Sequence, residues 1–274
     1  MTNVEFNIVS NILKTNGIEV FGFCNFNDTL PLLNCRAVAR LPLNPNSIIM
    51  CAFPYLVKEP SNVKRNISYY ACVPDYHKVV MNTLKRVSTD LKQTFQEYSF
   101  EPFTDNSPIR EVKASQLAGL GCIGKNGLLI TKKYGSYVFL GEIVTNMPLD
   151  NTSYNKSCIG CGLCEKECPT HSISNVNICE ETCLSAITQK KGELSKEEQL
   201  LMVENHTAWG CDKCQKVCPM NKNAQETNIL EFLNGVNHNL TEDSITKDGA
   251  YYWRGRKTIL RNIEILKKVD YLKR

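Results

Sequence analysis

Residues 157–221 hold the stretch that decides how this chain is organised. It opens with C-I-G-C-G-L-C-E-K-E-C-P at residues 158–169 and closes with C-D-K-C-Q-K-V-C-P at residues 211–219. The first run has the spacing C-x2-C-x2-C-x3-C-P, which is typical of bacterial iron–sulfur ligation. Three thiolates at this spacing can bind one cubane, and the fourth Cys, which precedes a Pro, ligates another cluster. The stretch therefore predicts two 4Fe–4S clusters.

The same spacing divides the thiolates between the two clusters. The first cluster takes three ligands from the first run and one from the C-P pair of the second: Cys158, Cys161, Cys164 and Cys218. The second takes Cys168, Cys211 and Cys214, with either Cys179 or Cys183 as its fourth ligand. Two zinc knuckles are the alternative, because C-x2-C pairs also suit zinc. Three thiolates at successive x2 spacing favour iron–sulfur, and a disulfide framework is less favoured still.

Composition and length set the limits of the remaining interpretation. The chain has 274 residues, enough for one large or two ordinary domains. No apolar run approaches the ~18 residues of a membrane helix, and the first residues lack the basic and apolar regions of a signal peptide. We therefore expect a cytoplasmic protein without a membrane partner. Six Cys outside the ligand set are scattered, which fits a reducing compartment: Cys24, Cys35, Cys51, Cys72, Cys122 and Cys179. A net charge of +4 is too small to indicate nucleic-acid binding alone.

Helical and strand patterns alternate ahead of the Cys-rich stretch. The pattern Thr2-x-x-Glu5 predicts a capped first helix that ends near Gly17. Further helices are expected from Asp75 to about Tyr98, over 109–118 and over 194–205, and strands over 18–23, 47–53, 128–131 and 136–145. This alternation indicates an α/β sheet domain. We expect three parts: an α/β domain at residues 1–149, a double-cluster domain at 150–225 and a helical segment at 226–274.

Two segments leave alternatives open. Residues 119–127 read G-L-G-C-I-G-K-N-G and match neither a phosphate loop nor a dinucleotide fingerprint. They could form a tight turn or a loop that admits a cofactor, because Gly lets the backbone approach a ligand. Residues 251–274 carry eight Lys and Arg against Glu264 and Asp270. That surface could be simply solvated or could track phosphates.

Several further motifs occur in one order between about residues 70 and 221. They are Tyr70-Ala71 through Asp75-Tyr76-His77, Asp105-Asn106-Ser107-Pro108-Ile109 with Glu111, Ala118-Gly119-Leu120-Gly121 through Gly124-Lys125, Gly135-Ser136 through Phe139-Leu140-Gly141-Glu142, Cys183-Leu184-Ser185, and Gly210 to Gln215 through Cys218-Pro219 and Asn221. With these motifs the chain resembles the epoxyqueuosine reductase family, cobalamin-dependent iron–sulfur enzymes related to reductive dehalogenases.

The resemblance implies an α+β fold. A nitroreductase-like α/β cobalamin-binding domain would precede a bacterial-ferredoxin-like double 4Fe–4S domain and a short C-terminal helical segment. It implies reduction of the epoxide of epoxyqueuosine in tRNA, the last step of queuosine synthesis, with electrons passing from the clusters to cobalamin. It also implies an external low-potential electron donor, and we expect a monomer.

Site residues follow from the same resemblance. Cys183 becomes the fourth ligand of the second cluster. Asp105 becomes the acid that protonates the departing epoxide oxygen, which calls for a desolvated carboxyl with a raised pKa; its alternative role is a helix N-cap before Ile109. The residues implied to contact cobalamin are Ile67, Asp105, Arg110, Gly124, Gly127, Leu128, Val138 and Ser185.

The departures from the family pattern concern the region implied to contact the substrate. They are Cys72-Val73-Pro74, Cys122, and a shortened stretch at 187–192; only residues 251–274 resemble the start of the family's helical-repeat domain. Three classes of function therefore stay open: a compact epoxyqueuosine reductase acting on tRNA, a cobalamin-dependent reductase of a small molecule with dehalogenase-like chemistry, and a two-cluster electron-transfer protein.

Overall fold

The computed structural model describes residues 2–174, 177–179 and 181–268. The chain forms two compact units, each assembled from separate segments. Unit 1 contains Met1–Pro54, His77–Gly124 and Leu128–Cys158, and unit 2 contains Tyr55–Tyr76, Lys125–Gly127 and Ile159–Arg274. These units are discontinuous in sequence, so they do not follow the three consecutive parts expected above, whose boundaries stay a prediction.

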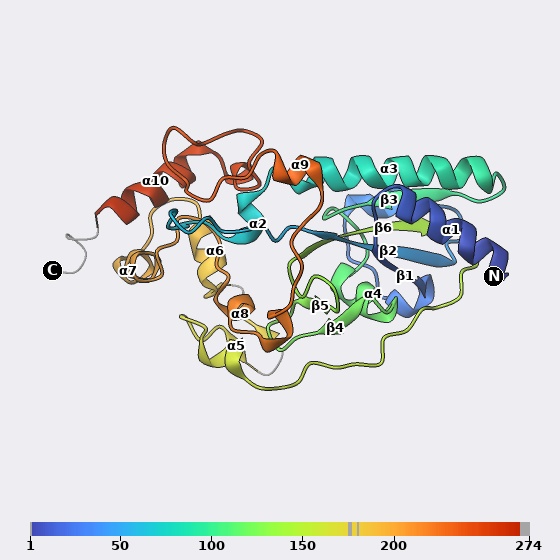
Figure 1. Cartoon of the computed structure of the whole chain (residues 1–274), viewed down its shortest axis with the longest axis horizontal. Helices are drawn as coiled ribbons and strands as arrows, with labels where there is room; N and C mark the ends of the chain where they lie inside the picture. The colour runs from blue at the N-terminus through green and yellow to red at the C-terminus, as the bar shows by residue number, and fades with distance from the viewer. Residues whose placement is uncertain (1, 175–176, 180, 269–274) are drawn as a thin grey trace. The chain divides into compact units, whose positions relative to one another are not determined.

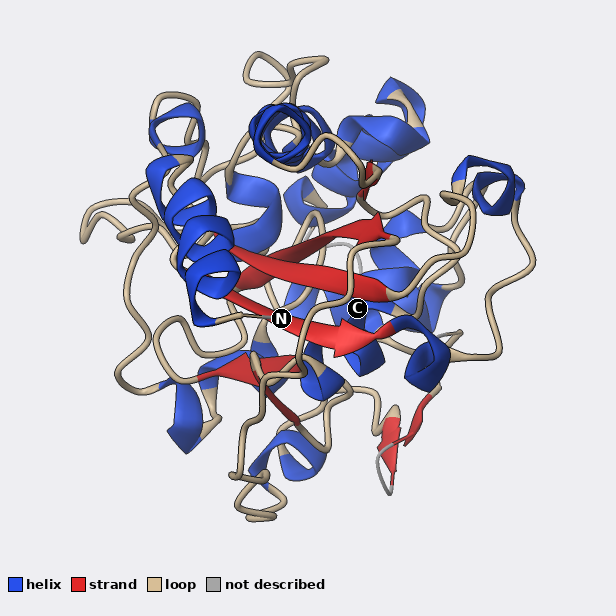
Figure 2. Cartoon of the chain, turned by 90° about the vertical axis from the view of Figure 1, so that its right-hand side faces the viewer, coloured by secondary structure: helices blue, strands red, loops and turns tan. Residues whose placement is uncertain are grey.

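A four-stranded antiparallel sheet forms the centre of unit 1 (Figures 1 and 2). Its strand order is β1 (Val20–Asn25), β2 (Ser47–Pro54), β6 (Val138–Thr145) and β3 (Phe100–Phe103). Every residue of β2 is buried, since the strand is central and both faces of the sheet are covered. In this register Glu142 of β6 stands opposite Met50 on one side and Phe103 on the other.

Two long helices cover one face of this sheet. α1 (Asn3–Thr15) packs Phe6 edge-on against Phe23 of β1, with the ring centroids 5.7 Å apart. α3 (Tyr76–Thr94) lies against β6 at Gly141, where an added Cβ would come within 2.8 Å of Val80 and Leu84. Gly141 is therefore required by the close approach of helix and strand.

The opposite face carries the short helix α4 (Glu111–Leu117) and a buried apolar cluster. Ala114 and Ala118 pack there with Ile48, Met50 and Val144 of the sheet. The small hairpin of β4 (Gly121–Ile123) and β5 (Leu129–Thr131) follows α4, and the short 3-10 turns η1 (Phe26–Thr29) and η2 (Arg36–Arg40) lie between β1 and β2. The result is a layer of helices on each face of one sheet, the mixed α and β architecture expected from the sequence.

Most predicted elements of unit 1 are present, with shifted ends. The capping box of Thr2 and Glu5 is confirmed, β1 begins two residues later than predicted, and α3 ends at Thr94 rather than near Tyr98. β3 and β4 were missed, because β3 contains Pro102 and β4 begins with Gly121, and Pro and Gly are depleted in strands.

Unit 2 consists of short helices joined by long loops. They are α2 (Tyr69–Cys72), α5 (Leu163–Lys166), α6 (Leu184–Gln189), α7 (Lys196–Glu204), α8 (Lys213–Lys216), α9 (Leu230–Leu233) and α10 (Arg256–Lys267), with the 3-10 turns η3 (Pro219–Asn221) and η4 (Tyr252–Arg254) and a two-stranded ribbon of β7 (Ile173–Ser174) and β8 (Asn177–Ile178). Its apolar core joins α6, α7 and α10 through Leu184, Ile187, Met202 and Ile265.

The basic helix α10 is an integral part of unit 2. Asn262 is fully buried, and its Nδ2 donates to the carbonyls of Thr188 and Ala208, each at 2.7 Å. Arg261 donates to the carbonyls of Lys190 and Gly192. Arg261 therefore closes a loop, a structural role that neither predicted alternative for this segment included. The predicted helix continued to Arg274, but residues 269–274 lie outside the described part. Among described residues, none forms a helix long and apolar enough to span a bilayer.

Candidate active site and cluster-binding segment

Asp105 lies on a tight loop of unit 1 between β3 and α4. Its φ of 58° is in the left-handed region that residues other than Gly rarely adopt. Its carboxylate Oδ2 is 3.1 Å from Nε2 of His77, at the start of α3, and its side chain is 62% exposed. The expected desolvated environment of Asp105 is therefore absent from this structure. The N-cap residue of α4 is Arg110, so the alternative cap role for Asp105 is wrong.

Hydrogen bonds to two glutamate side chains hold this loop in place. The N–H of Asp105 donates to Oε1 of Glu111 at 3.0 Å. The hydroxyl of Ser107 donates to Oε1 of Glu142 and accepts the N–H of Ile109 at 3.0 Å. The Asp105 contact joins the loop to the first turn of α4, the Ser107–Glu142 contact joins it to β6, and the Ser107–Ile109 contact lies within the loop. The Asp105 loop is thus anchored to two elements.

Glu111 and Glu142 form a pair of interacting carboxyl groups. Burial raises the pKa of Glu142 well above its usual range, and the charge of Glu111 adds to this rise. Burial also raises the pKa of Glu111, against the opposing effects of the Asp105 N–H and the Glu142 carboxyl. Residue Glu111 as a whole is only half-buried, yet burial is the largest influence on its carboxyl. Two buried carboxyl groups that interact in this way favour a state with fewer than two negative charges.

The eight residues expected to contact cobalamin fall into both units. Asp105, Arg110, Gly124, Leu128 and Val138 belong to unit 1, and Ile67, Gly127 and Ser185 belong to unit 2. Gly124 lies in the turn between β4 and β5 and has no side chain. Its N–H donates to the carbonyl of Leu128 at 2.9 Å. Leu128 and Val138 are half-buried and apolar. Small and apolar residues of this kind fit the face of a corrin in chemical character.

The glycine-rich stretch 119–127 builds a hairpin. Gly119 has φ 72° and lies against the backbone of Ser153, and an added Cβ on Gly121 would be 2.2 Å from the carbonyl oxygen of Ile130. These two glycines are explained by packing within unit 1. A role in admitting a cofactor remains a prediction for Gly124 and Gly127.

The expected ligands of the second cluster lie near one another in unit 2. Burial raises the pKa of Cys211 to about 11, and the nearby charges of Asp212, Cys183 and Cys168 add to the rise. Burial raises the pKa of Cys214 to about 12, with a further contribution from Cys211 and Cys183. The interacting thiols thus include Cys183, the residue preferred by resemblance, whereas Cys179 is exposed.

Cys168 has the surroundings of a stabilised thiolate. Burial alone would raise the pKa of its thiol, but hydrogen bonds from Thr170, Ser172 and Ile173 hold that pKa below its usual value. The N–H of Ser172 donates to its Sγ at 3.3 Å. Hydrogen bonds to sulfur are one means by which proteins tune iron–sulfur potentials.

The other four expected ligands are Cys158, Cys161, Cys164 and Cys218. Cys161 is exposed and the others are half-buried, and Cys158 is grouped with unit 1 whereas the other three are in unit 2. Across residues 2–174, 177–179 and 181–268, no three His, Cys, Asp or Glu side chains are close enough to hold a single metal ion. Their assignment to one cluster therefore rests on sequence spacing.

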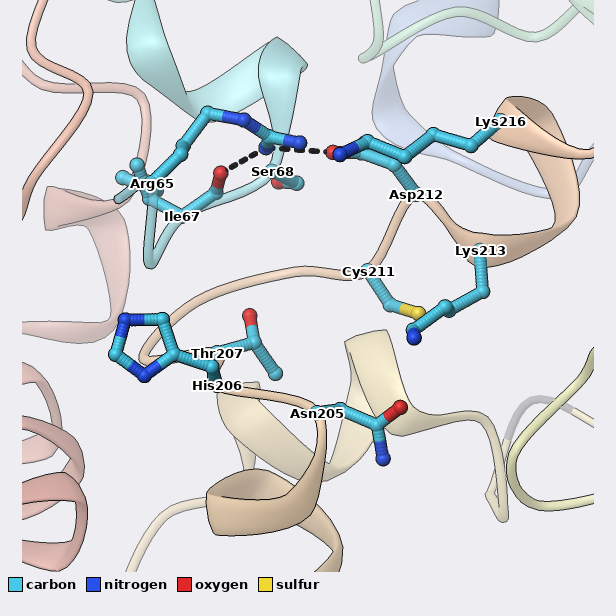
Figure 3. Close-up of a pocket in the computed structure, with 10 residues that line it drawn as sticks. All are labelled: Arg65, Ile67, Ser68, Asn205, His206, Thr207, Cys211, Asp212, Lys213 and Lys216. Carbon is cyan, nitrogen blue, oxygen red and sulfur yellow. Dashed lines mark hydrogen bonds and ion pairs between the residues drawn. The ribbon is translucent and has the colours of Figure 1, made fainter. Parts of the chain in front are cut away.

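A pocket of about 160 Å³ in unit 2 lies beside Cys211 (Figure 3). Its lining includes Ile67, His206 and Lys213, but not Asp105. Arg65 closes one side through a 2.7 Å ion pair with the buried Asp212, whose carboxylate also accepts the N–H of Tyr69. This ion pair fixes the residue that follows Cys211 and so helps to set the conformation of the C-D-K-C turn.

Gly210 makes a second connection at the same place. Its φ is 72°, and an added Cβ would be 2.0 Å from Oγ of Ser68. The N–H of Ser68 in turn donates to the carbonyl of Trp209 at 2.8 Å. A glycine is therefore required before Cys211.

Two stretches of the chain match known families. Residues 157–221 match the family described as a 4Fe-4S double cluster binding domain, and residues 37–106 match the family described as Epoxyqueuosine reductase QueG, DUF1730. The chain is 36% identical over 178 residues to an epoxyqueuosine reductase of Aliivibrio fischeri, across 64% of this chain and 47% of that relative. These matches support the epoxyqueuosine reductase family for this chain.

Solved structures of the epoxyqueuosine reductase family have the same fold. That from Streptococcus thermophilus is 25% identical, with a TM-score of 0.80 over 98% of this chain and 82% of that one. Another, crystallised with an epoxyqueuosine-modified tRNA-Tyr stem loop, is 23% identical with a TM-score of 0.80 over 97% of this chain and 81% of that one. The chain spans about half the length of the curated relatives it matches.

Three residues near Asp105 were not assigned a role from the sequence. His77, Glu111 and Glu142 each belong to a motif that carries the family resemblance. In the structure His77 pairs with Asp105. The available signal was the presence of one ionisable residue in each of three motifs, but their sequence separations gave no indication that they meet.

Proposed function

We propose that this chain reduces the epoxide of epoxyqueuosine in tRNA to the cyclopentene of queuosine, using two 4Fe–4S clusters and cobalamin. The observation that carries the proposal is similarity to the epoxyqueuosine reductase family combined with an anchored, accessible Asp105 in the same chain as a double-cluster segment. The structurally similar reductase bound to a tRNA stem loop supports tRNA as the substrate.

The clusters would be held by the two sets of thiolates that the sequence spacing and the family resemblance indicate. Cys158, Cys161, Cys164 and Cys218 would bind one cluster, and Cys168, Cys183, Cys211 and Cys214 the other. The mutual influence of Cys183, Cys211 and Cys214 supports the second set. The hydrogen bonds to Cys168 support its role as a thiolate.

Cobalamin would be held by the eight residues named from the resemblance. When bound, it supplies low-valent cobalt chemistry that no side chain can provide. The backbone at Gly124 and Gly127 would leave room for it, and Leu128 and Val138 would give apolar contacts. Ile67 and Ser185 would contribute from the segments that also surround the second cluster's ligands.

Asp105 would deliver the proton that the epoxide oxygen takes up when its carbon–oxygen bond breaks. General acids act through a short hydrogen bond to the departing atom, so the accessible carboxylate must be aimed by its surroundings. His77 orients that carboxylate from α3, and Glu111 fixes the backbone of the same residue. Binding of the substrate over the loop would then remove water from Asp105 and favour its protonated form.

Complementation tests the proposed substrate. The gene is expressed in a bacterial strain that lacks its own epoxyqueuosine reductase, and nucleosides from its tRNA are measured by mass spectrometry. Conversion of epoxyqueuosine to queuosine is the expected result. Continued accumulation of epoxyqueuosine would reject tRNA reduction, provided that the chain is present with both clusters.

A spectroscopic experiment tests the proposed cofactor separately. The anaerobically reconstituted protein is mixed with cobalamin, and the visible absorption bands of the corrin are recorded. A shift of these bands on binding is expected. Unchanged bands in the presence of intact clusters would instead favour a two-cluster electron-transfer protein.

A further inference from the structure

Glu142 is a buried carboxyl group in the middle of a sheet. It is fully buried on β6, between Met50 and Phe103 in the strand register. Its Oε1 accepts the hydroxyl of Ser107, whereas Oε2 has no N–H or O–H donor among the described residues. A buried carboxylate oxygen without a donor is costly. This cost disappears if the group carries a proton.

Glu111 offers an acceptor for that proton, because both carboxyl groups contact the same short loop: Glu111 accepts the N–H of Asp105, and Glu142 accepts the hydroxyl of Ser107. Each carboxyl group also influences the pKa of the other. Ionised carboxylates are acceptors only, so a hydrogen bond between the two groups would require one proton. Glu111 then retains a negative charge with which it accepts the N–H of Asp105.

The charged and titratable groups around the pair come from several elements. His77 and Asp105 face Glu111. Glu142 acts on the thiols of Cys24 on β1 and Cys51 on β2, both of which are buried. His77 is the one group among these that can become positively charged, and it faces Glu111 rather than Glu142. A second negative charge on the pair would thus lie in an unfavourable environment.

We propose that Glu111 and Glu142 share a single proton and are the positioning residues that hold the Asp105 loop in place, and that loss of this proton releases the loop. With one proton, the pair ties the N–H of Asp105 and the hydroxyl of Ser107 to α4 and β6. With none, two buried carboxylates repel each other, and Glu111, the less buried of the two, moves outward with the loop. The inference rests on the proposed function only for the use of Asp105 as the acid.

Amide hydrogen exchange tests the proposal without requiring turnover. Exchange of a peptide covering residues 104–110 is measured by mass spectrometry in the full chain with its clusters, from pH 6 to pH 9, after correction for the intrinsic exchange rate. In the wild type, protection should fall at least about tenfold as pH rises. In Glu142→Gln, whose amide cannot ionise but can donate to Glu111, protection should stay constant.

Two further variants sharpen the result. Glu111→Gln offers a neutral acceptor to the Asp105 N–H, so protection should be reduced at every pH. Glu101→Gln removes a carboxylate of the same unit that pairs with Arg40 instead, and it should retain the wild-type pH dependence. A wild-type loop whose protection is independent of pH, or an equal pH dependence in Glu142→Gln, would overturn the proposal.

Turnover provides a second and separable readout. If the chain reduces epoxyqueuosine, Glu142→Gln should extend the alkaline limb of the kcat profile while KM for a tRNA stem loop stays unchanged. Absence of turnover in every variant would count against the proposed function, and the exchange result would still decide whether the pair holds the loop. Normal turnover with an unchanged alkaline limb in Glu142→Gln would overturn the positioning role.

Discussion

Nε2 of His77 lies 3.1 Å from Oδ2 of Asp105. The contact joins the first turn of α3 to the loop before α4, two positions separated by 28 residues in the sequence. Both side chains are substantially exposed, at 43% and 62%. Exposed pairs of this kind contribute little to stability. The contact therefore serves better to orient the Asp105 carboxylate than to hold the fold together.

Replacement of Asp105 by Asn should remove the proton donor and leave the rest of the protein intact. Loss of a general acid typically lowers the rate by about 10²- to 10⁴-fold. We expect this loss in kcat for epoxyqueuosine reduction, with unchanged iron content and cobalamin binding. Asp28→Asn, an exposed carboxyl in the same unit, is the matched control. Full activity of Asp105→Asn would exclude Asp105 as the acid.

Replacement of His77 should affect the rate more than the stability. His77→Phe cannot hydrogen-bond to Asp105, and a misplaced catalytic group can lower kcat by about tenfold or more. His77→Gln keeps a donor at a similar position and should recover part of the rate. The free energy of unfolding, measured by thermal denaturation, should change by at most about 1 kcal/mol in both variants. Equal rates for the two variants would contradict an orienting hydrogen bond.

The fourth ligand of the second cluster can be identified by a pair of substitutions. Cys183→Ser should lose one cluster, and iron and acid-labile sulfide should fall to about half of the wild-type content. Cys179→Ser, the matched control, should keep both clusters, because Cys179 is exposed. Quantitation of iron and electron paramagnetic resonance after reduction would measure both. The reverse pattern would assign the ligand to Cys179.

The buried ion pair of Arg65 and Asp212 should be important for the stability of unit 2. Arg65→Met would leave the Asp212 carboxylate buried without its counter-charge, which typically costs about 3–5 kcal/mol. Urea unfolding of the anaerobic protein would measure this cost. Lys213→Met, an exposed cation next to Asp212, should change stability little. The double variant Arg65→Met with Asp212→Leu should recover part of the loss, and no recovery would contradict the electrostatic explanation.

The carboxyl pair should make the folded protein less stable as pH rises. Both groups have a folded-state pKa above the ordinary value of 4.5. Above that value the folded chain holds more protons than the unfolded chain, so the free energy of unfolding decreases with pH until the folded groups ionise. The slope is up to about 1.4 kcal/mol per pH unit for one proton.

Glu142→Gln removes this titration from the folded state. The variant and the wild type should be similarly stable near pH 5, and the variant should become the more stable protein toward pH 8. Urea unfolding at several pH values would show this divergence. Parallel stability curves would indicate that Glu142 is ionised in the folded protein or contributes nothing to the pH dependence.

Elements with a strong local signal were predictable. The capping box of α1, the apolar stripe of α3 and the continuous apolar run of β2 each depend on residues close in sequence. β3 and β4 were not, because they contain Pro102 and Gly121, which disfavour strands locally, and they become strands by pairing with β6 and β5. The sequence shows that residue 121 is a glycine. It does not show that the carbonyl of Ile130 packs against this position and excludes a side chain.

The sequence by itself determined the double-cluster segment, because the spacing of the Cys residues limits which thiolates can reach one cubane. It also indicated Asp105 through its motif. Only the tertiary structure decided what surrounds Asp105, since His77 and Glu111 contact it from α3 and α4, and Glu142 of β6 contacts Ser107 in the same loop. Sequence spacing can predict a metal site when most of its ligands lie close together in one segment of the chain. Hydrogen bonding and burial between distant elements exist only after the sheet and its helices have packed together.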